Sequence, residues 1–379
     1  MIFMKESDMI PAAEDPRERV PVSSVQVSAY RIPTDSPESD GTLAWDATTI
    51  VVVELTAGSK RGTGYTYADG CVATLIDKTL KGIILGSDAM DIPALHAALV
   101  RSIRNSGPAG LAMMAVSAVD IAAWDLKATL LELPLARLLG MAREACPLYG
   151  SGGFTSYSPD QLRAQLGGWA EDGFTAVKMK VGRDPSRDAS RVQAAREAVG
   201  GDVELFVDAN GAYGASRALG MAERFRDSGV TWFEEPVPSE ELETLGRIRA
   251  RLPAGMRLAA GEYGSDTGYF RDMLSAGAVD VLQADATRCG GITGFLKAGT
   301  LAQAFGVRFS SHCAPLAHLH AALSLPGFLT AEYFHDHARV EGLCFDGVPP
   351  PDGGVLRADL RRPGLGIRLK KQDLHDYAL

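Results

Sequence analysis

The fold is decided most clearly by residues 175–208, TAVKMKVGRDPSRDASRVQAAREAVGGDVELFVD. An apolar strand is predicted at 175–181, then a helix with apolar residues at helical spacing, then a second strand at 204–208. The same rhythm predicts further strands at 148–151, 230–235, 257–262, 279–285, 307–312 and, more weakly, 328–333. Strands and helices that alternate at this pitch predict a parallel sheet with right-handed crossovers. So many units in roughly 185 residues predict a closed barrel of the α/β class.

The residues before the barrel follow a different pattern. Strands come first, including the β-branched run TTIVVVEL at 48–55, and a helix follows with apolar residues at three- and four-residue steps between Val116 and Leu130. We therefore predict an α+β capping domain at 21–140 ahead of a barrel at 147–345. A tail at 1–20 precedes them. The segment 346–379, rich in proline and glycine, is expected to return to the capping domain.

Composition excludes several classes of function. The formal net charge is −9 and there is no basic block, which disfavours nucleic-acid binding. No apolar run approaches the roughly 20 residues of a membrane span, and the N-terminus does not resemble a secretory signal. The five cysteines form no CxxC pair, so a reducing cytoplasm is expected and a disulfide framework is not.

Ionisable residues stand where the predicted barrel strands end. The ends of parallel barrel strands converge on one mouth, where the chemistry of such barrels takes place. A single acid at such a position is usually a helix cap or a surface group, but seven in the same register indicate a site. They are Lys180, Asp208, Glu234, Glu262, Asp285, His312 and Glu332.

Three of these residues form a candidate metal site. Asp208, Glu234 and Glu262 end adjacent strands, and three carboxylates so close would repel one another unless a cation offset their charge. Hard oxygen ligands of this kind suit Mg²⁺. No histidine or cysteine joins them, which makes zinc the weaker choice.

The remaining residues suggest acid–base chemistry. Lys178 and Lys180 share one face of their strand, and two such ammonium groups beside a cation are expected to lower each other's pKa and so supply a neutral general base. Asp285 beside His312 would fix the tautomer of the imidazole and raise its basicity. Surface lysines, and a buried histidine satisfied by an acid, are the alternative interpretations.

The motifs VKMK, FVDAN, WFEEP, AAGE, ADATRCGG and SSH, with AVDIAAWDL earlier, resemble the enolase superfamily and, within it, the mandelate racemase subgroup. The resemblance implies a modified (β/α)₇β barrel with a capping domain, and Mg²⁺ on the three carboxylates. It implies that Lys180 and the His312–Asp285 pair act as acid/bases on opposite faces of the substrate. It also implies that Lys178 contacts the substrate carboxylate and that Glu332 hydrogen-bonds it as an enediolate forms. Glu332 comes from the weakest predicted strand.

The sequence leaves the reaction open. The expected lid at 33–45, PTDSPESDGTLAW, is polar, which favours a sugar acid over an aromatic substrate and dehydration to a 2-keto-3-deoxy acid. A racemase or epimerase of a 2-hydroxy acid is the main alternative. A non-catalytic ligand-binding relative is disfavoured because all seven groups are present. A homo-oligomer is expected.

The other histidines are assigned no catalytic role. His335, Asp336 and His337 are expected to be structural or to lie at the rim of the site. His318 and His320 follow a proline in a helical stretch and are expected to be packing or surface groups.

Overall fold

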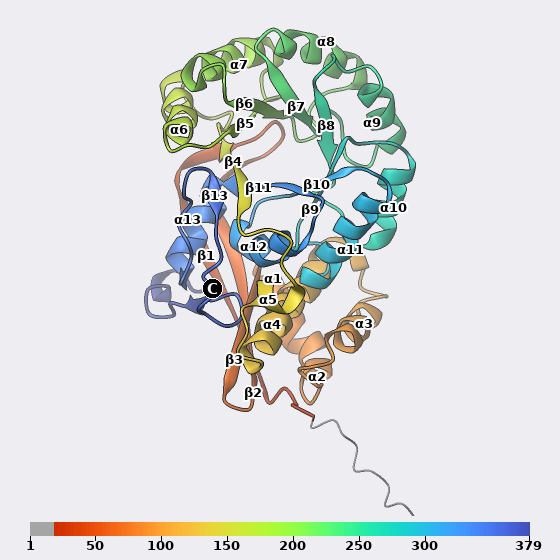
Figure 1. Ribbon diagram of the computed structural model, residues 1–379, viewed down its shortest axis with the longest axis vertical. Helices are drawn as coiled ribbons and strands as arrows, with labels where there is room; N and C mark the ends of the chain where they lie inside the picture. Colours follow the sequence, from red (N-terminus) through yellow and green to blue (C-terminus); the bar gives the residue numbers. More distant parts are fainter. Residues whose placement is uncertain (1–18) are drawn as a thin grey trace, which may run out of the picture.

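A computed structural model describes residues 19–379, so the tail expected at 1–20 lies almost wholly outside the described residues. The first unit is a three-stranded antiparallel sheet followed by helices, and Figure 1 shows it below the barrel. Its strands are β1 (Ser24–Ser39), β2 (Ala44–Ala57) and β3 (Lys60–Tyr67). Its helices are α1 (Cys71–Leu75), η1 (Ile76–Leu80), α2 (Lys81–Ile84), α3 (Ile92–Ser102), η2 (Pro108–Ala112), α4 (Met113–Leu130) and α5 (Leu135–Leu139).

Helix α4 forms the centre of this unit. It lies close against β3 because Gly62 and Gly64 of that strand have no side chain. A Cβ on Gly64, for example, would stand 2.3 Å from the carbonyl oxygen of Ala118 in α4. No apolar run of about 20 residues was expected; the helical stretch Pro108–Leu130, although interrupted by charged residues, would qualify for a membrane span by length and composition alone. Its most apolar window is 72% buried within the protein, which identifies it as a core helix.

The barrel consists of eight parallel strands, and pairing between the last and the first closes it. This confirms the predicted fold class, and the segment at 328–333 forms a full strand. The strands are β4 (Cys146–Gly152), β5 (Ala176–Lys180), β6 (Glu204–Asp208), β7 (Val230–Glu234), β8 (Arg257–Ala260), β9 (Val281–Ala284), β10 (Arg308–Ser311) and β11 (Phe328–Phe334). The intervening helices surround them (Figure 1): α6 (Pro159–Glu171), α7 (Pro185–Val199), α8 (Ala215–Arg226), α9 (Leu242–Arg249), α10 (Thr267–Ser275), α11 (Gly291–Ala304) and α12 (Pro315–Ser324).

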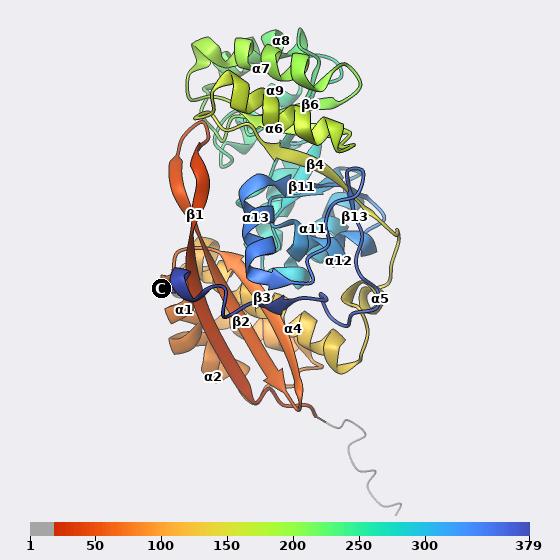
Figure 2. The ribbon, with the colours of Figure 1, turned by 90° about the vertical axis from the view of Figure 1, so that its left-hand side faces the viewer.

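The chain after the barrel runs back along both units. It contains α13 (His335–Cys344), β12 (Phe345–Asp346), β13 (Val355–Leu356), β14 (Arg368–Leu369) and η3 (His375–Tyr377). Strand β13 pairs antiparallel with β4, and the last residue, Leu379, donates its backbone N–H to the carbonyl oxygen of Ala29 in β1 at 3.0 Å. Figure 2 shows the C-terminus beside β1.

Two features of the fold position the site. Inside the barrel, an aromatic layer that includes Tyr149, Phe206 and Trp232 closes the interior, and the last two rings stack 4.8 Å apart. The indole N–H of Trp232 donates to Glu234 at 2.9 Å, so this layer lies directly against the charged groups. The second feature is the long β1–β2 hairpin, whose tip extends from the capping domain to the barrel (Figure 2).

Candidate active site

The three carboxylates predicted to bind a metal lie together. Asp208, Glu234 and Glu262 each offer an oxygen within 4.8 Å of the other two, and all three are buried. Asp208 and Glu234 are paired at the ends of β6 and β7. Glu262 is not at a strand end as expected, because β8 stops at Ala260. Gly261 connects the end of β8 to Glu262 with a φ of 129°. A Cβ at this position would stand 2.2 Å from a carbonyl oxygen of β9, so the position requires glycine.

The trio has the character of a cation site. Oxygen Oε2 of Glu262 is buried and has no hydrogen-bond partner. Burial and the nearby Asp208 carboxylate raise the pKa of Glu234 well above its usual value. Buried carboxylates that repel one another and retain a free oxygen fit a divalent cation with a preference for oxygen ligands.

The two lysines lie among these carboxylates. The Nζ atom of Lys178 is fully buried, 2.5 Å from Glu234, 2.8 Å from Glu332 and 3.6 Å from Asp208. The Nζ atom of Lys180 is 2.5 Å from Asp208.

The lowered lysine pKa was expected beside a bound cation and stays a prediction; without the cation, both pKa values are raised. Burial lowers the pKa of both lysines, and Lys178 lowers that of Lys180, but the carboxylates outweigh these effects and raise both pKa values. Asp208, Glu234 and Glu332 surround the two lysines with negative charge, which favours their protonated forms.

The predicted His–Asp pair is present. Nδ1 of His312 lies 2.8 Å from Oδ2 of Asp285, while the backbone N–H and hydroxyl of Thr287 both donate to Oδ1 at 2.7 Å. Although burial raises the pKa of Asp285, the bond from His312 holds it well below the usual range. An ionised Asp285 places the imidazole proton on Nδ1 and leaves Nε2 as the acceptor. Both residues follow their strands by one position.

Glu332 lies within β11 and its oxygens are engaged by the protein. Oε1 accepts from the Ser151 hydroxyl at 2.6 Å and from Lys178, and Oε2 accepts from the backbone N–H of Cys313 at 2.7 Å. Burial raises its pKa, but the charge of Lys178 outweighs this and the pKa is lowered. Glu332 is therefore an ionised partner of Lys178, and the expected contact with a substrate stays a prediction.

A cavity of about 220 Å³ opens over these groups, between the lid hairpin and the barrel. Lys180, Glu262 and His312 line it, so three of the predicted residues from distant strands face one space. Sequence reasoning missed several lining residues, although two stand inside motifs that it singled out: Asn210 in FVDAN and Arg288 in ADATRCGG. The missed residues are Asn210, Tyr263, Arg288, Cys313 and Phe334.

The polar side chains of the lid do not support the inference that its polarity reflects a sugar-acid substrate. Glu38 accepts from the indole of Trp45 at 2.8 Å, Ser39 hydrogen-bonds Thr155 at 2.6 Å, and Asp40 accepts from two backbone N–H groups of the hairpin turn. Of the three lid residues that line the cavity, Leu43 and Trp45 are apolar and Asp40 is polar; Ala47 and Thr48, just after the lid, also line it. The polarity of the segment 33–45 therefore serves the docking of the lid and does not describe the substrate.

The additional histidines have structural contacts. His318 and His320 are buried and accept from the backbone N–H groups of Ala286 at 2.7 Å and Ala136 at 3.0 Å, as expected for packing groups. His337 stacks on Tyr67 with ring centroids 3.5 Å apart and lines the rim of the cavity.

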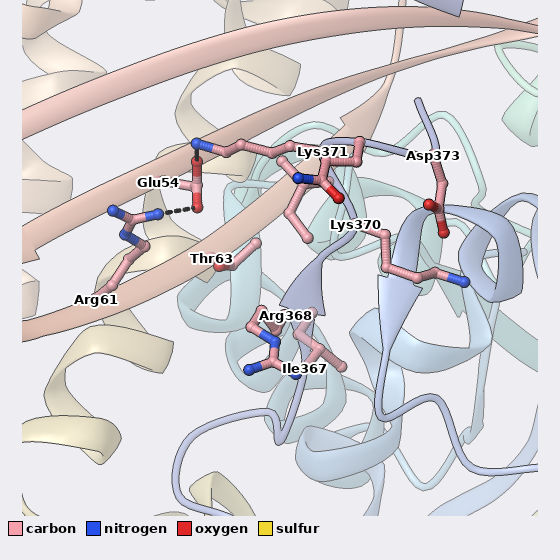
Figure 3. Close-up of a pocket in the computed structure, with 10 residues that line it drawn as sticks. Glu54, Arg61, Thr63, Ile367, Arg368, Lys370, Lys371 and Asp373 are labelled. Carbon is pink, nitrogen blue, oxygen red and sulfur yellow. Dashed lines mark hydrogen bonds and ion pairs between the residues drawn. The ribbon is translucent and has the colours of Figure 1, made fainter. Parts of the chain in front are cut away.

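A larger cavity of about 660 Å³ lies elsewhere, between the capping sheet and the C-terminal segment (Figure 3). At its edge Glu54 is clamped by Arg61 at 2.8 Å and by Lys371 at 2.5 Å. No barrel strand contributes to its lining among the described residues. This cavity lies between two segments of the chain, and none of the predicted site residues lines it.

Comparison with known proteins extends over nearly the whole chain. The family profile "Mandelate racemase / muconate lactonizing enzyme, N-terminal domain" matches residues 25–140, and "Enolase C-terminal domain-like" matches residues 161–373. The 3,6-anhydro-alpha-L-galactonate cycloisomerase of Streptomyces coelicolor is 32% identical, over 94% of this chain and 99% of that protein.

Two solved structures are similar. A mandelate racemase/muconate lactonizing enzyme-like protein from Rubrobacter xylanophilus is 52% identical, with a TM-score of 0.93 over 95% of this chain and 100% of that one. A variant of L-talarate/galactarate dehydratase, liganded with Mg and L-glucarate, is 28% identical, with a TM-score of 0.88 over 99% of this chain and 97% of that one.

Proposed function

This chain belongs to the mandelate racemase/muconate lactonizing enzyme family, and we propose that it dehydrates a sugar acid to a 2-keto-3-deoxy acid. The observation that carries the proposal is the cavity into which Lys180, Glu262 and His312 converge. Lys180 and His312 belong to strands two and seven of the barrel, so they face the space from different sides.

Asp208, Glu234 and Glu262 would hold the cofactor, Mg²⁺, which also accompanies L-glucarate in the similar dehydratase structure. When bound, Mg²⁺ supplies positive charge that favours the enediolate formed when the α-proton leaves. Lys180 would be closer to the neutral form that a base requires once a bound cation offset the carboxylates that raise its pKa.

The residues of this chain supply the proton transfers. One of the two acid/bases, Lys180 or His312, takes the α-proton, depending on the configuration of the substrate at that carbon. In dehydration, the α-proton that His312 has taken onto Nε2 passes to the β-hydroxyl, which leaves as water; where Lys180 is the base, His312 must enter the reaction already protonated on Nε2. The resulting enol takes up a proton at C3 and becomes the 2-keto acid. Asp285 holds the imidazole through the 2.8 Å contact with Nδ1, so Nε2 is the atom that exchanges the proton.

Support for a sugar acid comes from the cavity and from the relatives. Asn210, Tyr263 and Arg288 bring polar groups to the cavity wall, which suits a substrate with several hydroxyl groups. The similar dehydratase binds L-glucarate, and the Streptomyces relative acts on an anhydro-galactonate.

Racemisation or epimerisation of a 2-hydroxy acid is the second candidate. It is favoured by one observation, the presence of acid/base groups from two sides of the cavity, because a proton removed by one could be returned by the other. A non-catalytic role is disfavoured because all seven ionisable groups remain.

A screen of aldonic and aldaric acids with Mg²⁺ tests the proposal. We expect at least one acid to yield a 2-keto acid, detected as its semicarbazone, and mandelate to give no reaction. Deuterium uptake at C2 without 2-keto acid would favour the racemase instead. Neither product nor exchange with any acid would contradict both. A cytoplasmic location, to which five unpaired cysteines are suited, and a homo-oligomeric state belong to the same proposal.

A further inference from the structure

A second cluster of metal-ligating groups lies outside the cavity, where the lid meets the barrel. Asp35 and Glu38 belong to β1 in the lid, and His335 is the first residue of α13. Nε2 of His335 is 2.8 Å from Oδ2 of Asp35, and each of the three residues offers a ligand atom within 4.8 Å of the other two. The contact joins residues 300 positions apart in the sequence.

Glu38 is the residue that points to a ligand. Its side chain is only 1% exposed, and while Oε2 accepts from Trp45, Oε1 is buried with no hydrogen-bond partner. Leaving a buried carboxylate oxygen unpaired costs free energy that a bound cation would recover.

The surrounding charge points the same way. Asp336 adds a further carboxylate nearby, but the guanidinium of Arg339 is already occupied by Asp336 at 2.6 Å and by the carbonyl oxygen of Pro33 at 2.6 Å. Three carboxyl groups therefore share one guanidinium that already has other partners. Burial, and then the charge of Asp336, raise the pKa of Glu38 to about 8, so a bound cation would have to displace a proton from Glu38.

We propose that Asp35, Glu38 and His335 form a site for a divalent transition-metal ion, Zn²⁺ in particular, that fastens the lid to the barrel. One imidazole nitrogen and two carboxylate oxygens are ligands that zinc accepts, with a fourth position left for water. Mg²⁺ prefers oxygen ligands only, so the imidazole separates this site from the trio, which contains none.

The consequence is control of the lid. Leu43 and Trp45, further along the same hairpin, line the cavity, so the lid must be docked for the cavity to be complete. An ion that takes ligands from both the lid and α13 binds only the docked arrangement and shifts the lid toward it, whichever acid the cavity receives.

The test uses the full chain in excess Mg²⁺, titrated with Zn²⁺ by calorimetry. The variants His335→Asn and Glu38→Gln should each bind one Zn²⁺ ion fewer than the wild type. If that ion still binds, its affinity should fall by more than the roughly 10–100-fold that loss of a second-sphere hydrogen-bond partner costs. His375→Asn is the matched control, because it removes an exposed histidine far along the C-terminal segment and should keep that equivalent. His335→Asn changes a partly exposed side chain, so it tests the site even if Glu38→Gln fails to fold.

A second readout follows the lid itself. Zn²⁺ should slow hydrogen–deuterium exchange of residues 33–45 in the wild type and in His375→Asn, but not in His335→Asn. The proposal is overturned if the wild type binds no Zn²⁺ in excess Mg²⁺, if all variants bind it equally, or if exchange of the lid is the same with and without the ion.

Discussion

The buried His320 gives a quantitative prediction about stability. Its Nδ1 accepts from the backbone N–H of Ala136, a bond that requires the unprotonated nitrogen. Burial lowers the pKa of His320 from 6.5 to about 4. Because the unfolded chain binds the proton more readily, the contribution to stability is complete above pH 6.5 and is lost as the pH falls from 6.5 toward 4. At pH 5.5 the loss amounts to about 1.4 kcal/mol, one pKa unit of differential protonation.

Urea unfolding at pH 7.5 and pH 5.5 measures this loss. His320→Asn keeps an acceptor oxygen near the position of Nδ1 but does not titrate, so it should lose about 1.4 kcal/mol less than the wild type between the two pH values. His375→Asn, at an exposed position, should lose as much as the wild type. Equal losses in the wild type and His320→Asn would refute the reasoning, since other titrating groups are common to both.

Three further predictions concern the site and its surroundings. Asp208→Asn should weaken Mg²⁺ binding at least roughly 10–100-fold in calorimetry, and unchanged affinity would exclude Asp208 as a ligand. Gly261→Ala should lower the free energy of unfolding by more than the roughly 1–3 kcal/mol that backbone strain costs, because the added Cβ would meet a carbonyl oxygen of β9. It should also weaken Mg²⁺ binding. In the control, Gly255→Ala, φ is positive but the space is open, so only the cost of backbone strain should be measured. Lys371→Met should cost about 1 kcal/mol of stability or less and leave kcat unchanged, whereas a loss of activity would place the larger cavity in the reaction.

The fold was predictable because short apolar strands and amphipathic helices alternate so regularly. The strand at 204–208 matches β6 at both ends, and the strand at 230–235 exceeds β7 by one residue. Glu262 shows the limit of this reasoning. A left-handed glycine after β8 carries the chain two residues beyond the strand before the carboxylate turns inward, and a sequence pattern of period two does not reveal that turn.

The lid was harder to interpret for a related reason. The pairing of β1 with β2 shifts register between Pro33 and Glu38, so alternation along the segment does not indicate which side chains face the cavity. The predicted surroundings of the two lysines were incomplete, since the sequence places Lys178 beside Lys180, whereas the fold also brings Asp208, Glu234 and Glu332 against them. Contacts between distant strands decide both properties.

Exchange of the α-proton in D₂O tests the central claim most directly. With Mg²⁺ and a substrate acid of each configuration at C2, Lys180→Ala should abolish exchange from one configuration and spare the other, and His312→Asn should do the reverse. Each loss should reach or exceed the roughly 10²–10⁴-fold contribution of a general acid or base, while Lys297→Ala, on the outer face of α11, should exchange like the wild type. Wild-type exchange in both Lys180→Ala and His312→Asn would contradict the account, because neither residue would then be the base.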